Sequence, residues 1–299
     1  MASPLSTLPV SANWSAIAWN GSVFCAIAET NIAATSPDGR TWTQRTLPAS
    51  TYWKDIAWNG VVFCAISQYD SKAATSPDGI TWTLRTLPYG DWESIAWSGT
   101  TFCVVGSGGS KAATSPDGTT WTQRTLPSFS NWRVVVWNGT VFCAASSDGP
   151  VATSPDGITW TPQTSGGALY YSSAAWNGSV TCFVGLSSAN TATTADGVTW
   201  VLNSLVLPST TNWKSIVWNG EIFCAVSSVG TVAATSIDGV TWTQQAMPVS
   251  ASWKDIAWNG TVFCAIAYGS DIAATSIDGT FSEYSTFFWT NFNGQTEIL

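Results

Sequence analysis

The chain has 299 residues, of which 10 are Lys or Arg and 18 are Asp or Glu, so its formal net charge is −8. Only 9% of the residues are charged, and histidine is absent. Without histidine, Ser-His-Asp triads, Cys-His pairs and histidine-based metal sites are excluded. An acidic chain with no basic block is also a poor candidate for binding nucleic acid or an anionic membrane.

No segment of the sequence predicts export or membrane insertion. Residues 1–14 contain neither the basic nor the apolar region of a secretory signal peptide. No run approaches the roughly 18 consecutive apolar residues of a transmembrane helix. Because 45% of the residues are hydrophobic, a sizeable core is nevertheless expected.

One motif recurs seven times, at intervals of 39 to 42 residues. It consists of an aromatic residue, four further residues and then Trp-Asn-Gly, with Ser in place of Asn in the third copy. A cysteine follows each Gly by four positions, so the seven cysteines of the chain share one repeat position. Seven copies cover nearly the whole chain and leave no room for a second domain. The second aromatic residue of the motif is Trp19, Trp58, Trp97, Trp137, Trp176, Trp218 and Trp258.

The second copy illustrates the elements predicted for each repeat. A first strand with alternating character is followed by Asn59-Gly60, which is typical of a type I′ hairpin turn. The next strand is almost entirely apolar, as expected for burial on both faces, and the last one alternates again. No segment has an apolar period of 3.6 residues, so we predict almost no helix. The predicted strands are residues 53–58, 61–66, 71–76 and 81–85, with a second turn at 77–79.

Four antiparallel strands in about 40 residues is the period of a propeller blade. A single blade cannot bury both of its faces, whereas blades stacked around an axis can. We therefore predict an all-β fold, a seven-bladed β-propeller of four-stranded antiparallel blades, as a single domain over residues 1–290. An open β-solenoid is the competing fold, but the polar end caps that it needs are missing from the sequence. The predicted blades are residues 10–48, 49–88, 89–127, 128–165, 166–208, 209–248 and 249–290.

The two ends of the chain complement each other. Residues 6–9 repeat the end of the fourth strand of other copies, and the seventh copy lacks the Thr-Trp that elsewhere follows Asp-Gly. We therefore predict that residues 3–9 supply part of the outer strand of the last blade and close the ring. Residues 291–299 are predicted to be a C-terminal tail. The aromatic residues near it either pack on the ring or contact a partner, and these are Phe287, Phe288, Trp289 and Phe292.

The turn before the fourth strand carries the motif Ser-Pro-Asp-Gly-x-Thr-Trp, as at residues 36–42 and 76–82. This motif resembles the Asp-box of sialidase-like and related propellers, although it is one residue shorter between Asp and Gly. In those proteins the Asp accepts backbone N–H bonds, so the resemblance implies a structural role in the turn. The corresponding residues here are Asp38, Asp78, Asp117, Asp156, Asp196, Asp238 and Asp278.

The sialidase resemblance raises the question of catalysis. Such enzymes are expected to gather three arginines, a Tyr-Glu pair and an acidic residue near the axis. Here Arg45, Arg85 and Arg124 occupy one position of three successive outer strands, so they spread around the ring. No carboxylate pair recurs at a spacing that suits glycoside hydrolysis. We therefore predict a protein that is not an enzyme, with no catalytic residues, no metal and no cofactor.

The cysteines have a simpler interpretation. Equivalent positions in neighbouring blades lie on the order of 10 Å apart, which is beyond the reach of a disulfide. The chain contains no Cys-x-x-Cys sequence. We therefore expect the seven thiols to be small core groups in the second strand.

The first aromatic residue of each motif opens the first strand, close to the loop that links two blades. We predict that this set forms an aromatic girdle near one mouth of the ring or in the clefts between blades. Its flat faces could stack on sugars, with Asp55 and Asp255 among the polar groups beside it, or it could pack between blades. Lys54-Asp55 and Lys254-Asp255 also suit exposed charges on the rim. The members of the set are Trp14, Trp53, Trp92, Trp132, Tyr171, Trp213 and Trp253.

The whole repeat, over about residues 5–280, is similar to repeats in predicted bacteriophage virion and tail proteins. That similarity implies a non-enzymatic structural or host-surface-binding module of a capsid, tail or fibre. A multivalent lectin with sites between blades is the alternative, and a sialidase-like hydrolase is a third, weaker one. The partners expected are other virion proteins or a host-surface glycan, without nucleic acid or membrane insertion. The expected location is the virion, assembled in the host cytoplasm, or else the cytoplasm itself.

Overall fold

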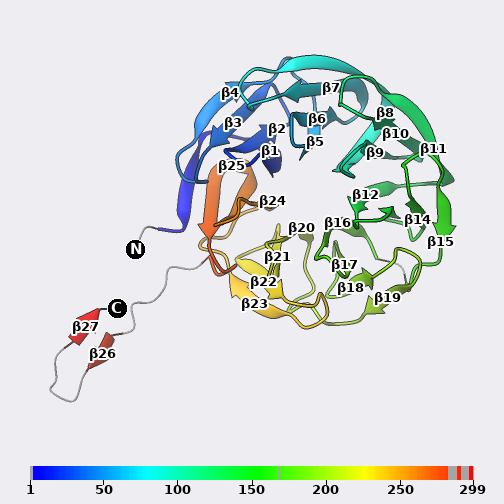
Figure 1. The fold of residues 1–299 in the computed structure, drawn as a ribbon. Coiled ribbons are helices and arrows are strands. Elements are labelled where there is room, and N and C mark those ends of the chain that lie inside the picture. Colours follow the sequence, from blue (N-terminus) through cyan, green and yellow to red (C-terminus); the bar gives the residue numbers. More distant parts are fainter. Residues whose placement is uncertain (1–2, 168, 282–287, 291–295, 299) are drawn as a thin grey trace.

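The computed structural model describes residues 3–167, 169–281, 288–290 and 296–298. All regular elements in these residues are β-strands, and all of them pair antiparallel. Apart from a two-stranded hairpin near the C-terminus, the sheets are built from repeats of four strands. Figure 1 shows the sheets side by side around a common axis, with the first strand of each repeat innermost and the fourth outermost. The prediction of an all-β protein of four-stranded antiparallel sheets is confirmed. No helix in the described residues has the length and apolar character needed to span a membrane.

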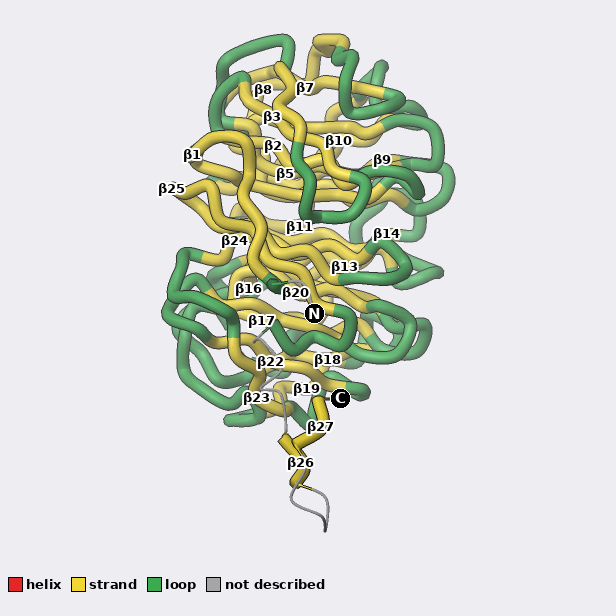
Figure 2. Tube along the Cα trace, turned by 90° about the vertical axis from the view of Figure 1, so that its left-hand side faces the viewer, coloured by secondary structure: helices red, strands yellow, loops and turns green. Residues whose placement is uncertain are grey.

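The first and last repeats share one six-stranded sheet. Its strands, in spatial order, are β24 (Trp253–Trp258), β25 (Phe263–Ser276), β1 (Leu5–Trp19), β2 (Phe24–Ala28), β3 (Ile32–Ser36) and β4 (Thr43–Thr46). The start of β1 pairs with β25, from Leu5 opposite Ala274 to Thr7 opposite Ile272, while its end pairs with β2. Figure 2 shows β1 beside β25. One long strand therefore links the last repeat to the first.

A second long strand joins the second and third repeats in a seven-stranded sheet. The strands of this sheet are β5 (Trp53–Trp58), β6 (Phe63–Ser67), β7 (Asp70–Ser76), β8 (Thr83–Trp97), β9 (Phe102–Ser107), β10 (Gly109–Ser115) and β11 (Thr122–Ser130). β8 is the outer strand of the second repeat and continues as the inner strand of the third.

The next three repeats each form a separate four-stranded sheet. Their strands are β12 (Trp132–Trp137), β13 (Phe142–Ser146), β14 (Val151–Ser154) and β15 (Thr161–Gln163); β16 (Tyr171–Trp176), β17 (Thr181–Gly185), β18 (Thr191–Thr194) and β19 (Trp200–Asn203); and β20 (Trp213–Trp218), β21 (Phe223–Ser227), β22 (Val232–Ser236) and β23 (Thr243–Ala246). A short hairpin of β26 (Phe288–Thr290) and β27 (Thr296–Ile298) follows near the C-terminus. The predicted roles of the C-terminal tail and of its aromatic side chains lie outside the described residues.

The turn after each inner strand differs from the prediction. In the second repeat Trp58 pairs with Phe63, so the connection has four residues, 59–62. The Asn59 Oδ1 atom accepts hydrogen bonds from the N–H groups of Val61 and Val62 at 2.9 and 2.7 Å. Gly60 has a φ of +93°, but Asn59 does not have the positive φ that a type I′ turn requires. The predicted type I′ turn is therefore wrong, because the Asn side chain closes the loop instead.

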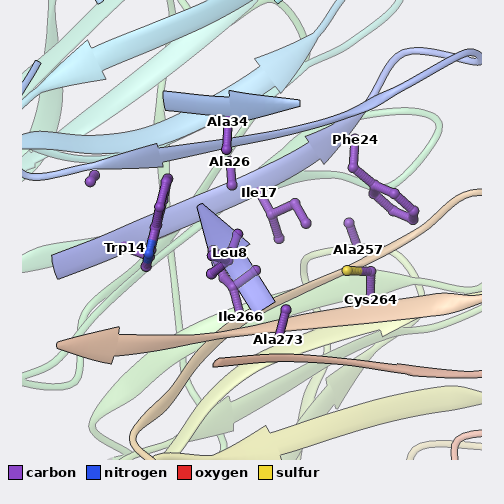
Figure 3. Packing of buried hydrophobic residues seen from close by; sticks show 11 residues of the cluster. Leu8, Trp14, Ile17, Phe24, Ala26, Ala34, Ala257, Cys264, Ile266 and Ala273 are labelled. Carbon is purple, nitrogen blue, oxygen red and sulfur yellow. The ribbon is translucent and has the colours of Figure 1, made fainter. Parts of the chain in front are cut away.

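The core lies in layers between neighbouring sheets. Each layer combines the cysteine of one repeat with the first aromatic residue of the next, as Cys25 does with Trp53. Figure 3 shows the layer that contains Cys264 and Trp14, which joins the last repeat to the first. All seven cysteines are free and fully buried, so their predicted role as small core residues is confirmed. Burial raises the pKa of these thiols.

The Asp-Gly turns pack on the preceding repeat with no space to spare. A Cβ on Gly79 would lie 2.9 Å from Thr35 Cγ2 and 3.2 Å from Cys25 Sγ. The same arrangement recurs between Gly39 of the first repeat and Thr275 and Cys264 of the last. Glycine therefore serves these turns both by its positive φ and by its lack of a side chain.

Candidate functional site

One position of the repeat faces a pocket at the common axis of the sheets, which has a volume of about 560 Å³. This position follows the first aromatic residue of each motif. A β-bulge falls there in every inner strand, as between Trp53 and Asp55 in β5. A bulge leaves one residue out of the ladder and redirects its side chain, here toward the axis. The seven residues that line the pocket in this way are Ser15, Lys54, Glu93, Arg133, Ser172, Lys214 and Lys254.

Glu93 is the centre of an ion cluster on one side of the pocket. Its buried carboxylate lies 2.7 Å from Lys54 Nζ and 2.7 Å from Arg133 Nη1. Gln68 Nε2 donates a third hydrogen bond to it at 2.9 Å. A buried carboxylate with two cationic partners is well compensated. The charges of Lys54 and Arg133 are therefore partly committed to Glu93.

Lys214 and Lys254 line the same pocket but form no ion pair within the described residues. Burial, together with the positive charges of Lys54 and Arg133, lowers the pKa of Lys214. Burial and the charges of Lys54 and Lys214 lower the pKa of Lys254 to about 8. The Lys254 Nζ atom lies 5.8 Å from the centre of the Tyr268 ring, within the range of a cation–π contact. An anion in the pocket would relieve the repulsion between these amines.

Asp55 and Asp255 also line the pocket, and they join neighbouring repeats. Asp55 Oδ2 accepts the N–H of Ile95 at 2.9 Å, and Asp255 Oδ2 accepts the N–H of Ile17 at 2.8 Å. Ser215 donates a further bond of 2.6 Å to Asp255. Burial raises the pKa of both carboxyls, and with the nearby charge of Asp255 it brings that of Asp55 to about 7. The expectation of exposed rim charges is thus corrected, since both residues are half-buried at the axis.

The predicted aromatic girdle lies inside the molecule. Each indole N–H of the set donates to the carbonyl four residues earlier, as Trp53 Nε1 does to Ala49 at 3.0 Å. A side chain with no exposed face cannot stack on a sugar, so the prediction of a stacking surface is corrected in favour of packing between sheets. Tyr171 alone of the set also lines the pocket, and its buried hydroxyl has no hydrogen-bond partner. The buried residues are Trp14, Trp53, Trp92, Trp132, Tyr171, Trp213 and Trp253.

The turn carboxylates lie at the opposite end of the inner strands from the bulges. Asp38 Oδ1 accepts the N–H groups of Arg40 and Thr41, each at 2.8 Å. These bonds outweigh the effect of burial and lower the pKa of Asp38. Equivalent backbone bonds to the carboxylate are found in all seven repeats, at Asp38, Asp78, Asp117, Asp156, Asp196, Asp238 and Asp278.

Lys54, Asp55, Lys254 and Asp255 were predicted from the sequence to lie beside the aromatic set, but not to share a pocket with the other residues that line it. A signal was present, because the position after the first aromatic residue is charged in five of seven repeats of a chain with only 9% charged residues. What was missing was the bulge that turns this position toward the axis. For metals, no group of three His, Cys, Asp or Glu side chains in the described residues is arranged to hold an ion.

No family model and no curated protein matches the chain. Solved structures do match, although with little sequence identity. A catalytically inactive histidine-to-alanine variant of virginiamycin B lyase from Staphylococcus aureus, with Quinupristin, matches with a TM-score of 0.79 and 11% identity over 91% of this chain and 98% of the lyase. YCF48 bound to D1 peptide gives 0.72 and 15% over 92% and 96%, and the Neurospora crassa Pan2 WD40 domain gives 0.71 and 9% over 95% and 99%. The fold is a β-propeller.

These matches contradict the functional prediction made from the sequence. The similar propellers include a lyase, a protein bound to a peptide and a WD40 domain, and none of them is a virion protein. The expectation of a virion module, with its lectin and sialidase-like alternatives, is therefore wrong. The error arose because a repeat motif that specifies a propeller was used to infer a biological setting.

Proposed function

We propose that this protein is a non-enzymatic binding protein whose axial pocket holds an anionic group of its ligand. The observation that supports this most directly is that positive charge is concentrated at one pocket of an otherwise acidic chain. Four of the ten Lys and Arg side chains line one pocket, although the net charge of the chain is −8. They are Lys54, Arg133, Lys214 and Lys254.

The charges within the pocket support an anion rather than a cation. Glu93 is matched by Lys54 and Arg133, and the raised pKa values of Asp55 and Asp255 reduce the negative charge that these two carry near neutral pH. Their oxygens are also engaged by backbone N–H groups. The amines of Lys214 and Lys254 are then the groups left to bind an incoming carboxylate or phosphate.

We further propose that the seven repeats form seven blades in a closed ring. The pairing of β1 with β25 supports this, as does the hydrophobic layer between Cys264 and Trp14. The hydrogen bond from Ile17 to Asp255 crosses the same boundary. Closure matters for function, because it brings the same bulge position of every repeat to one axis.

The non-enzymatic part of the proposal is supported by the residue types present. The matched lyase is named as catalytically inactive when one histidine is replaced by alanine, whereas this chain contains no histidine. The acidic groups of its pocket are already committed to lysine, arginine or backbone partners. A binding role needs none of these acidic groups to act as a free acid or base.

The test is calorimetric titration with citrate and with inorganic phosphate. Replacing the two pocket lysines that form no ion pair in the described part of the chain, Lys214→Gln with Lys254→Gln, should weaken binding by about tenfold or more, because two charge-assisted contacts are lost. Raising the salt from about 0.05 to about 0.5 M should also weaken binding by the wild type.

A matched control is available in the chain itself. Arg85 and Arg124 each bond a threonine hydroxyl of the adjacent strand, and Gln163 makes the same bond in another repeat. Arg85→Gln with Arg124→Gln therefore removes two positive charges away from the pocket and should leave anion binding within about twofold. Equal losses in the two double variants, or no binding of either anion by the wild type, would refute the proposal.

A further inference from the structure

Large aromatic side chains are exposed in four consecutive linkers on the rim where the inner strands begin. Tyr52, Tyr89, Phe129 and Tyr170 have 56%, 68%, 80% and 64% of their surface exposed. We call these four residues the aromatic arc. The linkers before the first, sixth and seventh inner strands carry no aromatic residue just ahead of Trp14, Trp213 and Trp253. The arc therefore covers one part of the rim and is not a requirement of the repeat.

Two neighbouring residues, Tyr69 and Lys111, contact the aromatic arc. Tyr69 meets Tyr52 edge to face with ring centres 6.0 Å apart, and Tyr69 is itself exposed. Lys111 Nζ lies 5.5 Å from the centre of the Tyr89 ring and donates to the Tyr89 carbonyl at 3.1 Å. Tyrosine offers a large contact area at low conformational cost, so an exposed set of this kind is typical of interaction surfaces.

The arc is continuous with the axial pocket. Tyr170 belongs to the arc and also lines the pocket. The arc lies at the second to fifth repeats, whereas Lys214 and Lys254 enter the pocket from the sixth and seventh. A partner that lies on the arc and extends over the pocket would place an acidic group near these two amines.

The surrounding charge favours a partner with a single acidic group rather than a polyanion. Outside the pocket, this rim carries more acidic than basic residues, which are Glu29, Asp70, Asp91, Asp148 and Asp271 against Lys72 and Lys111. A nucleic acid or a sulfated polysaccharide would meet repulsion there, because such polymers need positive charge along their length. A polypeptide can present apolar side chains to the arc and one carboxylate to the pocket.

We propose that the aromatic arc and the axial pocket together bind a polypeptide segment that carries an acidic residue next to apolar ones. The segment rests its apolar side chains on Tyr89 and Phe129 and directs its carboxylate to Lys214 and Lys254. This inference deepens the proposed function and rests on it, because the pocket supplies the anion contact.

The test is a random-sequence peptide array probed with the full-length protein. Selected peptides should combine Asp or Glu with neighbouring apolar residues, and their affinity is then measured by fluorescence anisotropy. Tyr89→Ser with Phe129→Ser should weaken peptide binding by about tenfold, as expected for the loss of aromatic anchors. The control, Ile80→Ser with Ile158→Ser, changes two exposed residues of the opposite rim and should leave affinity unchanged.

Citrate separates this inference from the proposal on which it rests. The arc variant should bind citrate as the wild type does, whereas the variant of Lys214 and Lys254 should lose both citrate and peptide. If the wild type binds citrate but the selected peptides bind the arc variant as tightly as the wild type, this inference is overturned and the proposed function stands. The same holds if the selected peptides share no acidic residue. Heparin or single-stranded DNA that binds more tightly than the selected peptides and depends on the arc would overturn it as well.

Discussion

The two rims of the propeller differ in how strictly the same residue types recur from repeat to repeat. On the rim of the turns, an Asn or Ser side chain closes one loop, an Asp caps the other and a Gly packs on the preceding cysteine in every repeat. On the rim of the pocket, the bulge position changes from serine to lysine, glutamate and arginine, and only some linkers carry exposed aromatics. Identical demands of ring geometry explain the first rim. They do not explain the second, so its variation is where a ligand is expected to act.

The first way to test the contrast is at two adjacent residues on the pocket rim. Trp53→Ala should lower the free energy of unfolding by about 3–5 kcal/mol, because it empties a buried site between two sheets. Tyr52→Ala should change it by less than about 0.5 kcal/mol, because the Tyr52 side chain is exposed. Urea unfolding followed by fluorescence measures both. Equal changes in the free energy of unfolding would mean that burial does not determine which of these two residues stabilises the fold.

The turn rim can be tested with two glycines that share a positive φ. Gly60→Ala should cost about 1–2 kcal/mol from backbone strain alone, since nothing lies within 4 Å of its added Cβ. Gly79→Ala should cost about 1–3 kcal/mol more, because its Cβ would meet Thr35 and Cys25 of the preceding repeat. Thermal unfolding of the two variants decides the matter. If Gly79→Ala lowered stability no more than Gly60→Ala does, the close contact between repeats would not contribute to the cost of the substitution.

Asp55, beside the axial pocket, and Asp38, in a turn, should respond to pH in opposite directions. The pKa of Asp55 is raised to about 7, so the folded state holds its proton more tightly, and stability should fall as the pH rises from about 4 to about 7. The pKa of Asp38 is lowered, so its contribution is present above about pH 4 and is lost as the pH falls through the folded value. Melting temperatures should therefore peak between these ranges, with changes of a few degrees.

Single variants assign the two limbs of this profile. Asp55→Asn should flatten the decline above pH 4 and leave the acid limb in place. Asp38→Asn should reduce the acid limb only, and by a small amount, because six equivalent turns remain. A profile that Asp55→Asn leaves unchanged would exclude Asp55 as the titrating group.

The strands were predictable because the same turn residues mark them in every repeat. The Asn-Gly pair located the first hairpin correctly but not its geometry, since an Asn side chain can cap a longer loop as well as occupy a left-handed turn. The burial of the thiols was predictable too, because a small residue in an almost entirely apolar strand is expected in the core.

The candidate site was harder to predict because a bulge has no signature in the pattern of apolar residues. Two polar residues, Lys54 and Asp55, follow Trp53, and their types alone do not show which of them leaves the ladder and turns toward the axis. Both faces of each sheet are covered by neighbours, and alternation therefore could not tell that Trp53 is buried and Tyr52 exposed. The exposed tyrosines were overlooked because they do not keep one position in the repeat.

The pairing of Leu5 with Ala274 constrains the order in which the chain can fold during synthesis. The first strand leaves the ribosome long before the segment that it pairs with has been translated, so its backbone groups wait without their final partner. The sheet that joins the first and last repeats can form only after Ala274 has been synthesised. A strand that waits for its partner can pair with the matching segment of a second copy instead, which is the general route to domain swapping.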